Sequence, residues 1–241
     1  MTVLNETTLA PVERRPFDAL GTANHGWLDT HFHFSFAGYH DPARLQWGAI
    51  RVWNDDWIAA GAGFPPHPHA DMEIITYVRK GAISHRDSLG NEGKTGAGDV
   101  QVMSAGSGVT HAEFNAEDEP CELFQIWIIP EARGGEPGWG MKPFPKADRS
   151  GKLQLLASGF GEEDALSIRA SARLHCATLA AGSELRHNIG EGRCAYLVPA
   201  TGSVDVNGTA IETRDGAAIG AGEIVIRTDE PTELVLVEAA A

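Results

Sequence analysis

The sequence predicts an all-β protein built from two domains. The chain has 241 residues, a length that suits two domains of about 100–150 residues each. It contains 28 glycines and 13 prolines, so turns are frequent. Turn residues separate short alternating or β-branched segments at spacings of about 8–12 residues, which is typical of a β-sandwich or barrel. No segment has the pattern of a long amphipathic helix.

Six segments in the first half of the chain have strand patterns, after a polar and loose arm that ends near residue 20. In residues 31–36, histidine or serine alternates with phenylalanine, the period-2 signal of a strand. The other segments alternate or are rich in β-branched and aromatic residues: residues 49–53, 73–78, 82–87, 99–103 and 123–129. Residues 54–56 (Asn-Asp-Asp) are predicted to end the second of these strands.

Residues 131–151 are rich in proline and glycine and break the strand pattern, so they form the best candidate linker. Strands resume beyond it at residues 196–198, 203–206, 218–227 and 233–237. Asn207-Gly208 predicts a tight hairpin between two of them. We therefore place an N-terminal domain at residues 1–145 and a C-terminal domain at residues 146–241.

Charge and cysteine content exclude several functional classes. The net charge is −14 and the basic residues are scattered, which argues against direct binding to nucleic acid or to an anionic membrane. Cys121, Cys176 and Cys194 have no C-x-x-C spacing, and this odd number fits a reducing compartment. No apolar run approaches the roughly 20 residues of a membrane span, and residues 1–6 lack a signal-peptide pattern. With charge spread evenly, we expect a cytoplasmic monomer.

Two pairs of side chains carry the metal-binding signal. His67 and His69 are two positions apart, as are His111 and Glu113, and alternate residues of an extended chain face the same side. Pro68 keeps the first segment extended. Two such strands side by side would surround one point with three imidazoles and a carboxylate, a set that suits a divalent first-row metal with open positions. The spacing also allows a hydrogen-bonded His111–Glu113 pair without a metal.

Longer motifs around these residues resemble the pirin family of bicupins. The pattern G-x5-HPH-x3-E over residues 61–73 is similar to the first cupin motif, and G-x7-GSG-x2-H-x3-N over residues 98–115 is similar to the second. Pirin-like stretches occur in order at residues 33–36, 51–56, 66–74, 85–91 and 103–115. The resemblance covers about residues 27–130 and implies two tandem cupin barrels of jelly-roll type. The second barrel is expected to lack metal ligands.

The pirin resemblance implies a ligand set of His67, His69, His111 and Glu113. Generic cupins take the carboxylate from the first motif, here Glu73, and residue parity alone leaves both glutamates open. The metal expected from the resemblance is Fe(II), and Mn, Ni, Co, Cu or Zn suit the same ligands.

The remaining histidines and the aromatic residues have structural interpretations. His175 and His187 are isolated and are expected to be structural or surface residues, whereas His33 and His85 should lie nearest the pocket. A group of aromatic side chains is expected in the barrel core, some of them lining a cavity for a flat aromatic ligand: Phe32, Phe34, Phe36, Trp53 and Phe64.

Some pirin-like proteins are quercetin dioxygenases. The resemblance therefore implies a metal-dependent flavonol dioxygenase that takes a flavonol and dioxygen and releases carbon monoxide, with Glu113 accepting the substrate proton. An alternative is a non-enzymatic regulator that binds a transcription factor or a metabolic enzyme in a metal- or redox-dependent way. A third possibility is another cupin reaction on a different enolisable compound.

Overall fold

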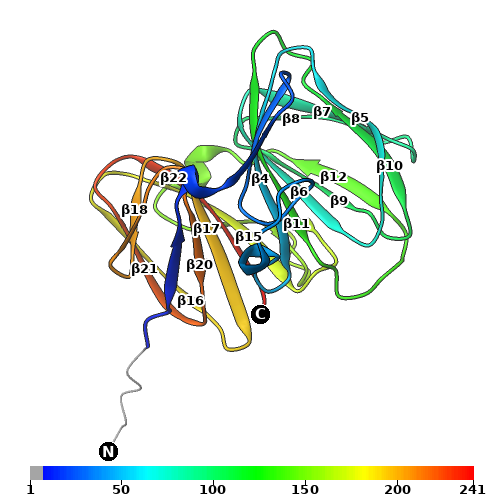
Figure 1. Ribbon diagram of the computed structural model, residues 1–241. Coiled ribbons are helices and arrows are strands. Elements are labelled where there is room, and N and C mark those ends of the chain that lie inside the picture. Colours follow the sequence, from blue (N-terminus) through cyan, green and yellow to red (C-terminus); the bar gives the residue numbers. More distant parts are fainter. Residues whose placement is uncertain (1–7) are drawn as a thin grey trace, which may run out of the picture.

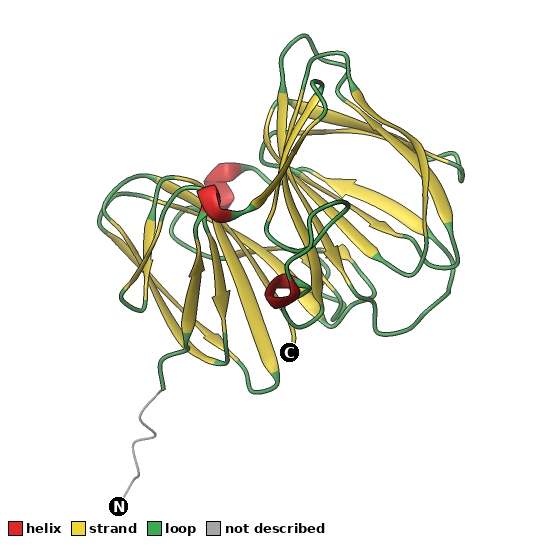
Figure 2. Cartoon of the chain, in the orientation of Figure 1, coloured by secondary structure: helices red, strands yellow, loops and turns green. Residues whose placement is uncertain are grey.

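The computed structural model describes residues 8–241 of the chain (Figure 1). Residues 1–7, which include the segment compared above with signal peptides, lie outside this range. The described chain forms two β-rich units, and each combines a seven-stranded with a four-stranded sheet (Figure 2). The all-β prediction is confirmed. In the described residues, no helix has the length and apolar character needed to cross a membrane.

The first unit contains most of the strands predicted before residue 130. Its seven-stranded sheet has the spatial order β12 (Gly138–Lys142), β9 (Val100–Ser104), β6 (Glu73–Lys80), β11 (Cys121–Ile128), β4 (Ile50–Ile58), β3 (Leu28–Phe32) and β2 (Gly21–Asn24). Its four-stranded sheet consists of β5 (Gly63–His69), β10 (Val109–Phe114), β7 (Ala82–Asp87) and β8 (Glu92–Gly96). All neighbouring strands in both sheets are antiparallel.

The second unit repeats this arrangement. Its seven-stranded sheet has the order β1 (Val12–Arg15), β20 (Gly216–Ile219), β17 (Arg193–Thr201), β22 (Thr232–Ala240), β15 (Ala172–Leu179), β13 (Gln154–Ser158) and β14 (Leu166–Ser167). Its four-stranded sheet consists of β16 (Ser183–Ile189), β21 (Gly222–Thr228), β18 (Val204–Val206) and β19 (Thr209–Ile211). The predicted hairpin at Asn207-Gly208 joins β18 to β19, and both residues have positive φ, as a tight turn requires.

The arm predicted to be loose up to residue 20 packs on the second unit over its described residues, which begin at residue 8. Its strand β1 pairs antiparallel with β20, with Val12 opposite Ile219. Arg14 Nε donates to Asp215 Oδ2 at 2.6 Å, and the short helix η1 (Phe17–Ala19) follows. Local sequence gave no sign of this pairing because the partner strand lies near the other end of the chain.

The strand end predicted at residues 54–56 is wrong, because β4 continues to Ile58. The two charged residues stay in the strand since each has a partner. Asp55 Oδ2 accepts from Arg214 Nε of the second unit at 2.5 Å, and Asp56 Oδ1 accepts from the hydroxyl of Thr30. Buried carboxyl groups with such partners do not interrupt a strand.

The predicted linker at residues 131–151 also contains regular structure. Residues 138–142 form β12 and pair with β9, and the short helix η3 (Lys146–Arg149) follows. Trp139 fixes β12 because its ring stacks on His85, with ring centroids 4.7 Å apart. A third short helix, η2 (Pro42–Arg44), lies between β3 and β4. The single strand predicted at residues 218–227 is two strands, β20 and β21.

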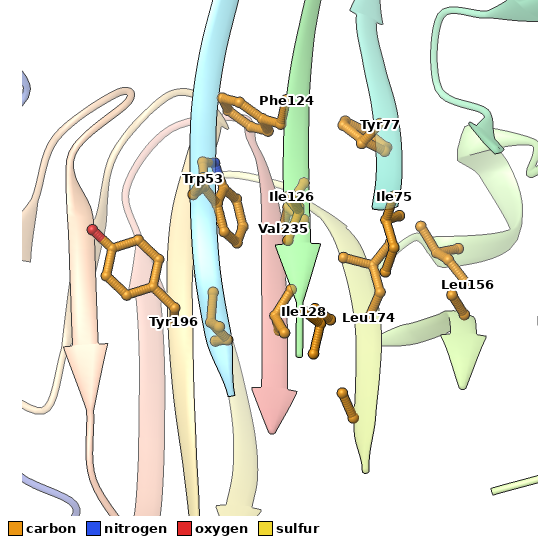
Figure 3. Packing of buried hydrophobic residues seen from close by; sticks show 14 of the residues in the cluster. Trp53, Ile75, Tyr77, Phe124, Ile126, Ile128, Leu156, Leu174, Tyr196 and Val235 are labelled. Carbon is orange, nitrogen blue, oxygen red and sulfur yellow. The ribbon is translucent and has the colours of Figure 1, made fainter. Parts of the chain in front are cut away.

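Side chains from both seven-stranded sheets form one hydrophobic core between the units (Figure 3). Trp53 lies at its centre, with ring centroids 5.5 Å from those of both Phe124 and Tyr196. A Cβ on Gly216 would lie 1.9 Å from Tyr196 Oη, so this position fits only glycine. The guanidinium of Arg149, buried at the same interface, donates to Tyr77 Oη at 3.0 Å. The two units therefore share a core and are not joined by a linker alone.

Candidate metal centre

The pairing of β5 with β10 brings the predicted histidines together. His67 lies opposite His111, and Val109 lies opposite His69. The imidazole centroids of the three histidines are 4.5–4.9 Å apart, and one nitrogen of each lies within 4.8 Å of the others. The register shifts just beyond this point, where Pro65-Pro66 of β5 cannot donate ladder hydrogen bonds. We call His67, His69 and His111 the histidine trio.

The protonation of His67 follows from its partner. Its Nδ1 lies 2.7 Å from the carbonyl oxygen of Pro65. A carbonyl oxygen only accepts, so Nδ1 carries the proton and the Nε2 lone pair is left free. In this tautomer the Nε2 atom of His67 is free to act as a ligand atom.

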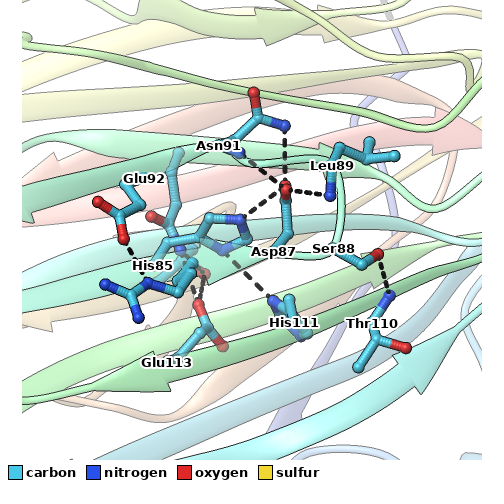
Figure 4. A network of polar contacts seen from close by, with 12 residues as sticks. His85, Asp87, Ser88, Leu89, Asn91, Glu92, Thr110, His111 and Glu113 are labelled. Atoms are coloured by element: carbon cyan, nitrogen blue, oxygen red, sulfur yellow. Dashed lines mark hydrogen bonds and ion pairs between the residues drawn. The ribbon is translucent and has the colours of Figure 1, made fainter.

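His111 is held by a chain of polar contacts that ends at a carboxylate (Figure 4). His85 Nε2 lies 3.1 Å from Asp87 Oδ2, and His85 Nδ1 lies 3.4 Å from His111 Nδ1. Because an ionised carboxylate only accepts, His85 Nε2 carries the proton and its Nδ1 accepts from His111 Nδ1. The lone pair of His111 is then on Nε2, which is buried and has no hydrogen-bond partner within residues 8–241. A metal ion would satisfy this atom.

Asp87 is fixed in turn by the loop after β7. Its carboxylate accepts from the side-chain amide of Asn91 at 2.9 Å and from the backbone N–H of Leu89 at 2.9 Å. Burial opposes ionisation, but hydrogen bonds from Asn91, His85 and Leu89 outweigh it and lower the pKa of Asp87. The chain Asp87–His85–His111 therefore ends in a charged acceptor at neutral pH, the arrangement that commonly orients metal-binding histidines.

Two members of the histidine trio, His69 and His111, have a charge state that suits metal binding. Burial, with a smaller contribution from His67, lowers the pKa of His69 to about 4. Burial and the neighbouring histidines lower the pKa of His111 to about 3. Both rings are therefore neutral at pH 7, as a transition-metal ligand must be. The donors present fit a divalent first-row metal.

Glu113 lies beside His111 and is surrounded by amide donors. Gln101 Nε2 donates to its Oε1 at 2.7 Å, and Gln125 Nε2 donates to its Oε2 at 2.9 Å. Burial raises the pKa of Glu113 to about 7, although hydrogen bonds from Thr76 and Gln101 oppose the shift. Its carboxylate forms a cluster with His85 and His111, in which the ligand atoms lie within 4.8 Å of one another. This cluster differs from the histidine trio, although both contain His111.

Glu73, His85 and His33 were also expected near the site, and only His85 lies beside the histidine trio. Glu73, the alternative carboxylate, is occupied elsewhere, because its Oε2 accepts from Ser104 Oγ at 2.6 Å and from the backbone N–H of Arg169 at 3.0 Å. His85 reaches the histidine trio as expected. His33 does not, because it lies in the core between the units, with Nδ1 3.0 Å from Tyr196 Oη.

A cavity of about 680 Å³ opens beside the histidine trio and is lined by His67 and His69. Most of its wall is aromatic or aliphatic. Phe32, Phe36 and Phe64 of the predicted aromatic group line it, whereas Phe34 and Trp53 pack in the core between the units. The other aromatic lining residues are Trp27, Tyr39 and Trp127. Such a cavity suits a flat aromatic ligand.

The isolated histidines of the second unit have structural partners or surroundings. His187 Nε2 lies 3.0 Å from Glu238 Oε2. Burial and the neighbouring His187 lower the pKa of His175 to about 4. Within residues 8–241, both clusters of three metal-ligand side chains lie in the first unit.

The sequence did not predict the roles of several residues around the site. Asp87 bonds His85 and Gln101 bonds Glu113, and these contacts depend on strand pairing, which the sequence alone does not show. Gln125 did give a signal, because it is a polar residue within the most apolar stretch of the chain. A buried polar residue in such a stretch indicates a buried polar partner, here Glu113.

Comparison with known proteins gives consistent matches over nearly the whole chain. Residues 13–128 match the family model described as Pirin, and residues 155–239 match the model described as Quercetinase C-terminal cupin domain. A pirin-like protein of Caulobacter vibrioides is 60% identical, with 95% of this chain and 100% of the relative covered. Quercetin 2,3-dioxygenase of Escherichia coli K12 is 40% identical, with 90% and 93% covered. The crystal structure of the bacterial pirin YhhW of Escherichia coli with nickel(II) aligns with a TM-score of 0.90 at 38% identity, covering 95% and 99%.

Proposed function

The chain belongs to the pirin family, with two cupin domains in tandem, and from this premise we propose that it is a metal-dependent dioxygenase of flavonol type. The substrates would be a flavonol such as quercetin and dioxygen, and the ring would be cleaved with release of carbon monoxide. One observation carries the proposal: three clustered histidines, two of them with Nε2 left free, line or adjoin an aromatic cavity. The names of the relatives support the choice of substrate.

We propose His67, His69, His111 and Glu113 as the metal ligands and Fe(II) as the metal, with Mn, Ni, Co, Cu or Zn as alternatives. Free Nε2 atoms on His67 and His111 support the histidine part of this set. A divalent metal is further supported by the nickel(II) complex of YhhW. When bound, the metal would act as a Lewis acid that favours the ionised form of the flavonol 3-hydroxyl.

The remaining steps depend on the protein's own groups. The aromatic wall of the cavity excludes water and fixes the plane of a flat substrate, through side chains such as Phe64 and Trp127. Glu113 would accept the proton of the 3-hydroxyl, since its carboxyl group lies within 4.8 Å of a ring nitrogen of His111 at the proposed metal site. Gln101 and Gln125 hold its two oxygens in place during this transfer.

Metal analysis combined with a turnover assay tests the proposal. The purified protein should contain about one divalent metal per chain, and quercetin added in air should lose its flavonol absorbance with release of carbon monoxide. Bound metal without turnover, after reconstitution with iron, manganese, nickel, cobalt and copper, would reject the dioxygenase function. In that case the family's regulatory type, which binds a protein partner, becomes the better description.

The two candidate carboxylate ligands can be separated by substitution. Glu113→Gln should weaken metal binding by about 10–100-fold, because it removes the charge next to the histidine trio. Glu73→Gln should leave metal affinity within about twofold, since Glu73 bonds Ser104 and Arg169. Metal affinity is measured by competition with a chelator of known strength. If Glu73→Gln releases the metal and Glu113→Gln retains it, the carboxylate has been assigned wrongly.

Asp87 should influence the metal without touching it. Asp87→Asn removes the charge that holds His85 and, through it, His111 in the required protonation, so metal affinity should fall by about tenfold. Glu92→Gln is the matched control, because Glu92 lies nearby but pairs with the exposed Arg86. The same chelator competition is used for both variants, and their thermal unfolding is compared. Equal metal affinity in Asp87→Asn and wild type would show that His111 needs no such support.

Broader sequence predictions also remain part of the proposal. We propose a domain boundary at residues 145/146, apart from β1, which pairs in the sheet of the second unit. We also propose a cytoplasmic location and a monomeric state, with no direct binding to nucleic acid. The second barrel is proposed to lack a metal.

A further inference from the structure

One wall of the aromatic cavity carries a buried carboxyl group that the proposed function does not use. Asp56 lies on β4, lines the same cavity as His67 and His69, and is 2% exposed. Its Oδ1 accepts from the hydroxyl of Thr30. Within residues 8–241, no hydrogen bond is made to the second carboxyl oxygen, Oδ2.

The surroundings of Asp56 are largely apolar. The wall of the cavity includes Leu28, Phe32 and Phe64, and no lysine or arginine of the described residues lines it. Burial raises the pKa of Asp56 to about 7, and the nearby Asp55 and Glu113 add to the shift. A carboxyl oxygen that borders a cavity and has no protein partner is free to bond a ligand there.

Asn54 adds a second polar group to the same wall. It lies two residues before Asp56 on β4, and both side chains therefore point to the same side of the sheet. Its Oδ1 is buried and has no hydrogen-bond partner among the described residues. Two neighbouring polar side chains with unused hydrogen-bonding capacity indicate a ligand that carries hydrogen-bonding groups of its own.

We propose that Asp56 is a specificity-determining residue, which hydrogen-bonds a phenolic hydroxyl of a flat aromatic substrate other than the hydroxyl that would meet the metal. This inference rests on the proposed function, because it takes the metal-binding end of the substrate to lie at His67 and His69. Asp56 Oδ2 accepts from the hydroxyl when the carboxylate is ionised and donates to it when protonated. The site therefore selects polyhydroxylated aromatic compounds over those that carry only the metal-binding hydroxyl and ketone.

Anaerobic binding of two flavonols to the metal-loaded protein tests the proposal. Quercetin and 3-hydroxyflavone share the hydroxyl and ketone that would meet the metal, but 3-hydroxyflavone has no other hydroxyl group. Wild type should bind quercetin at least about tenfold more tightly, since 3-hydroxyflavone leaves Asp56 without a partner. Asp56→Leu should lose about tenfold in quercetin affinity and keep its affinity for 3-hydroxyflavone within about twofold. Asp56→Asn, which retains hydrogen-bonding groups, should keep quercetin affinity within about threefold.

Controls separate recognition from a structural role. Asp29→Leu makes the same change on β3, at a residue that does not line this cavity, and should leave both affinities unchanged. If Asp56→Leu does not fold, Asp56→Ala is measured in its place. An equal loss for both ligands, or no loss for either, overturns the role of Asp56 and leaves the proposed function standing. Failure of wild type to bind either flavonol overturns both.

Discussion

Replacing His111 with alanine should release the metal and abolish quercetin turnover. His111 occupies the centre of the site: its ring lies 4.5 Å from that of His67 and 4.9 Å from that of His69, and its Nε2 is buried without a protein partner. Outer residues that orient a ligand are worth about 10–100-fold in metal affinity, so loss of a ligand should cost at least about 100-fold. Metal content after dialysis and loss of flavonol absorbance give the two measurements.

The control for this variant is His40→Ala. His40 is exposed and lies outside the cavity, so its replacement should leave metal content and turnover unchanged. Circular dichroism and thermal unfolding establish that the His111→Ala protein is folded before its metal content is compared. Full metal stoichiometry in folded His111→Ala protein would contradict the proposed ligand set.

Replacing Trp53 with alanine should lower the free energy of unfolding by about 3–5 kcal/mol. The side chain is fully buried and packs against Phe124 of its own sheet and Tyr196 of the other unit (Figure 3). The substitution leaves a cavity in the core that the two units share. Urea denaturation followed by circular dichroism measures the loss, and separation into two transitions would show that the units have become uncoupled.

Trp57→Ala is the matched control, because Trp57 lies on the same strand and is 36% exposed. Its replacement should cost no more than about 1 kcal/mol. A similar loss in both variants would mean that the stability of β4 itself, and not packing between the units, explains the effect of Trp53.

The sequence predicted those parts of the fold that depend on neighbours along the chain. Strands such as β6 and β9 alternate or are β-branched and lie close to the predicted ranges. Strand β4 was predicted too short, because Asp55 and Asp56 resemble a turn unless the distant Arg214 and Thr30 are known. A carboxyl group near a strand end is a local signal, whereas its hydrogen-bond or ion-pair partner elsewhere in the chain is not.

In the candidate site, too, local spacing could be predicted, whereas contacts that depend on strand register could not. His67, His69, His111 and Glu113 were found because alternate residues of a strand face one side, and the structure brings the three histidines together. The support of His111 by His85 and Asp87 could not be predicted, since it requires the register of β7 against β10. The same holds for Asp56, whose place on the cavity wall depends on the pairing of β4 with β3 and β11.

The position of β1 has a consequence for biosynthesis. Arg14 and its partner Asp215 are 201 positions apart, so β1 leaves the ribosome about 10–40 s before its partner at ordinary synthesis rates of ~5–20 residues per second. During this interval an unpaired strand could associate with other nascent chains. The sequence of β1, Val-Glu-Arg-Arg, is short and charged, which is how edge strands avoid such association. Within the described residues, β1 is the first strand to be synthesised, and it becomes the edge strand beside β20.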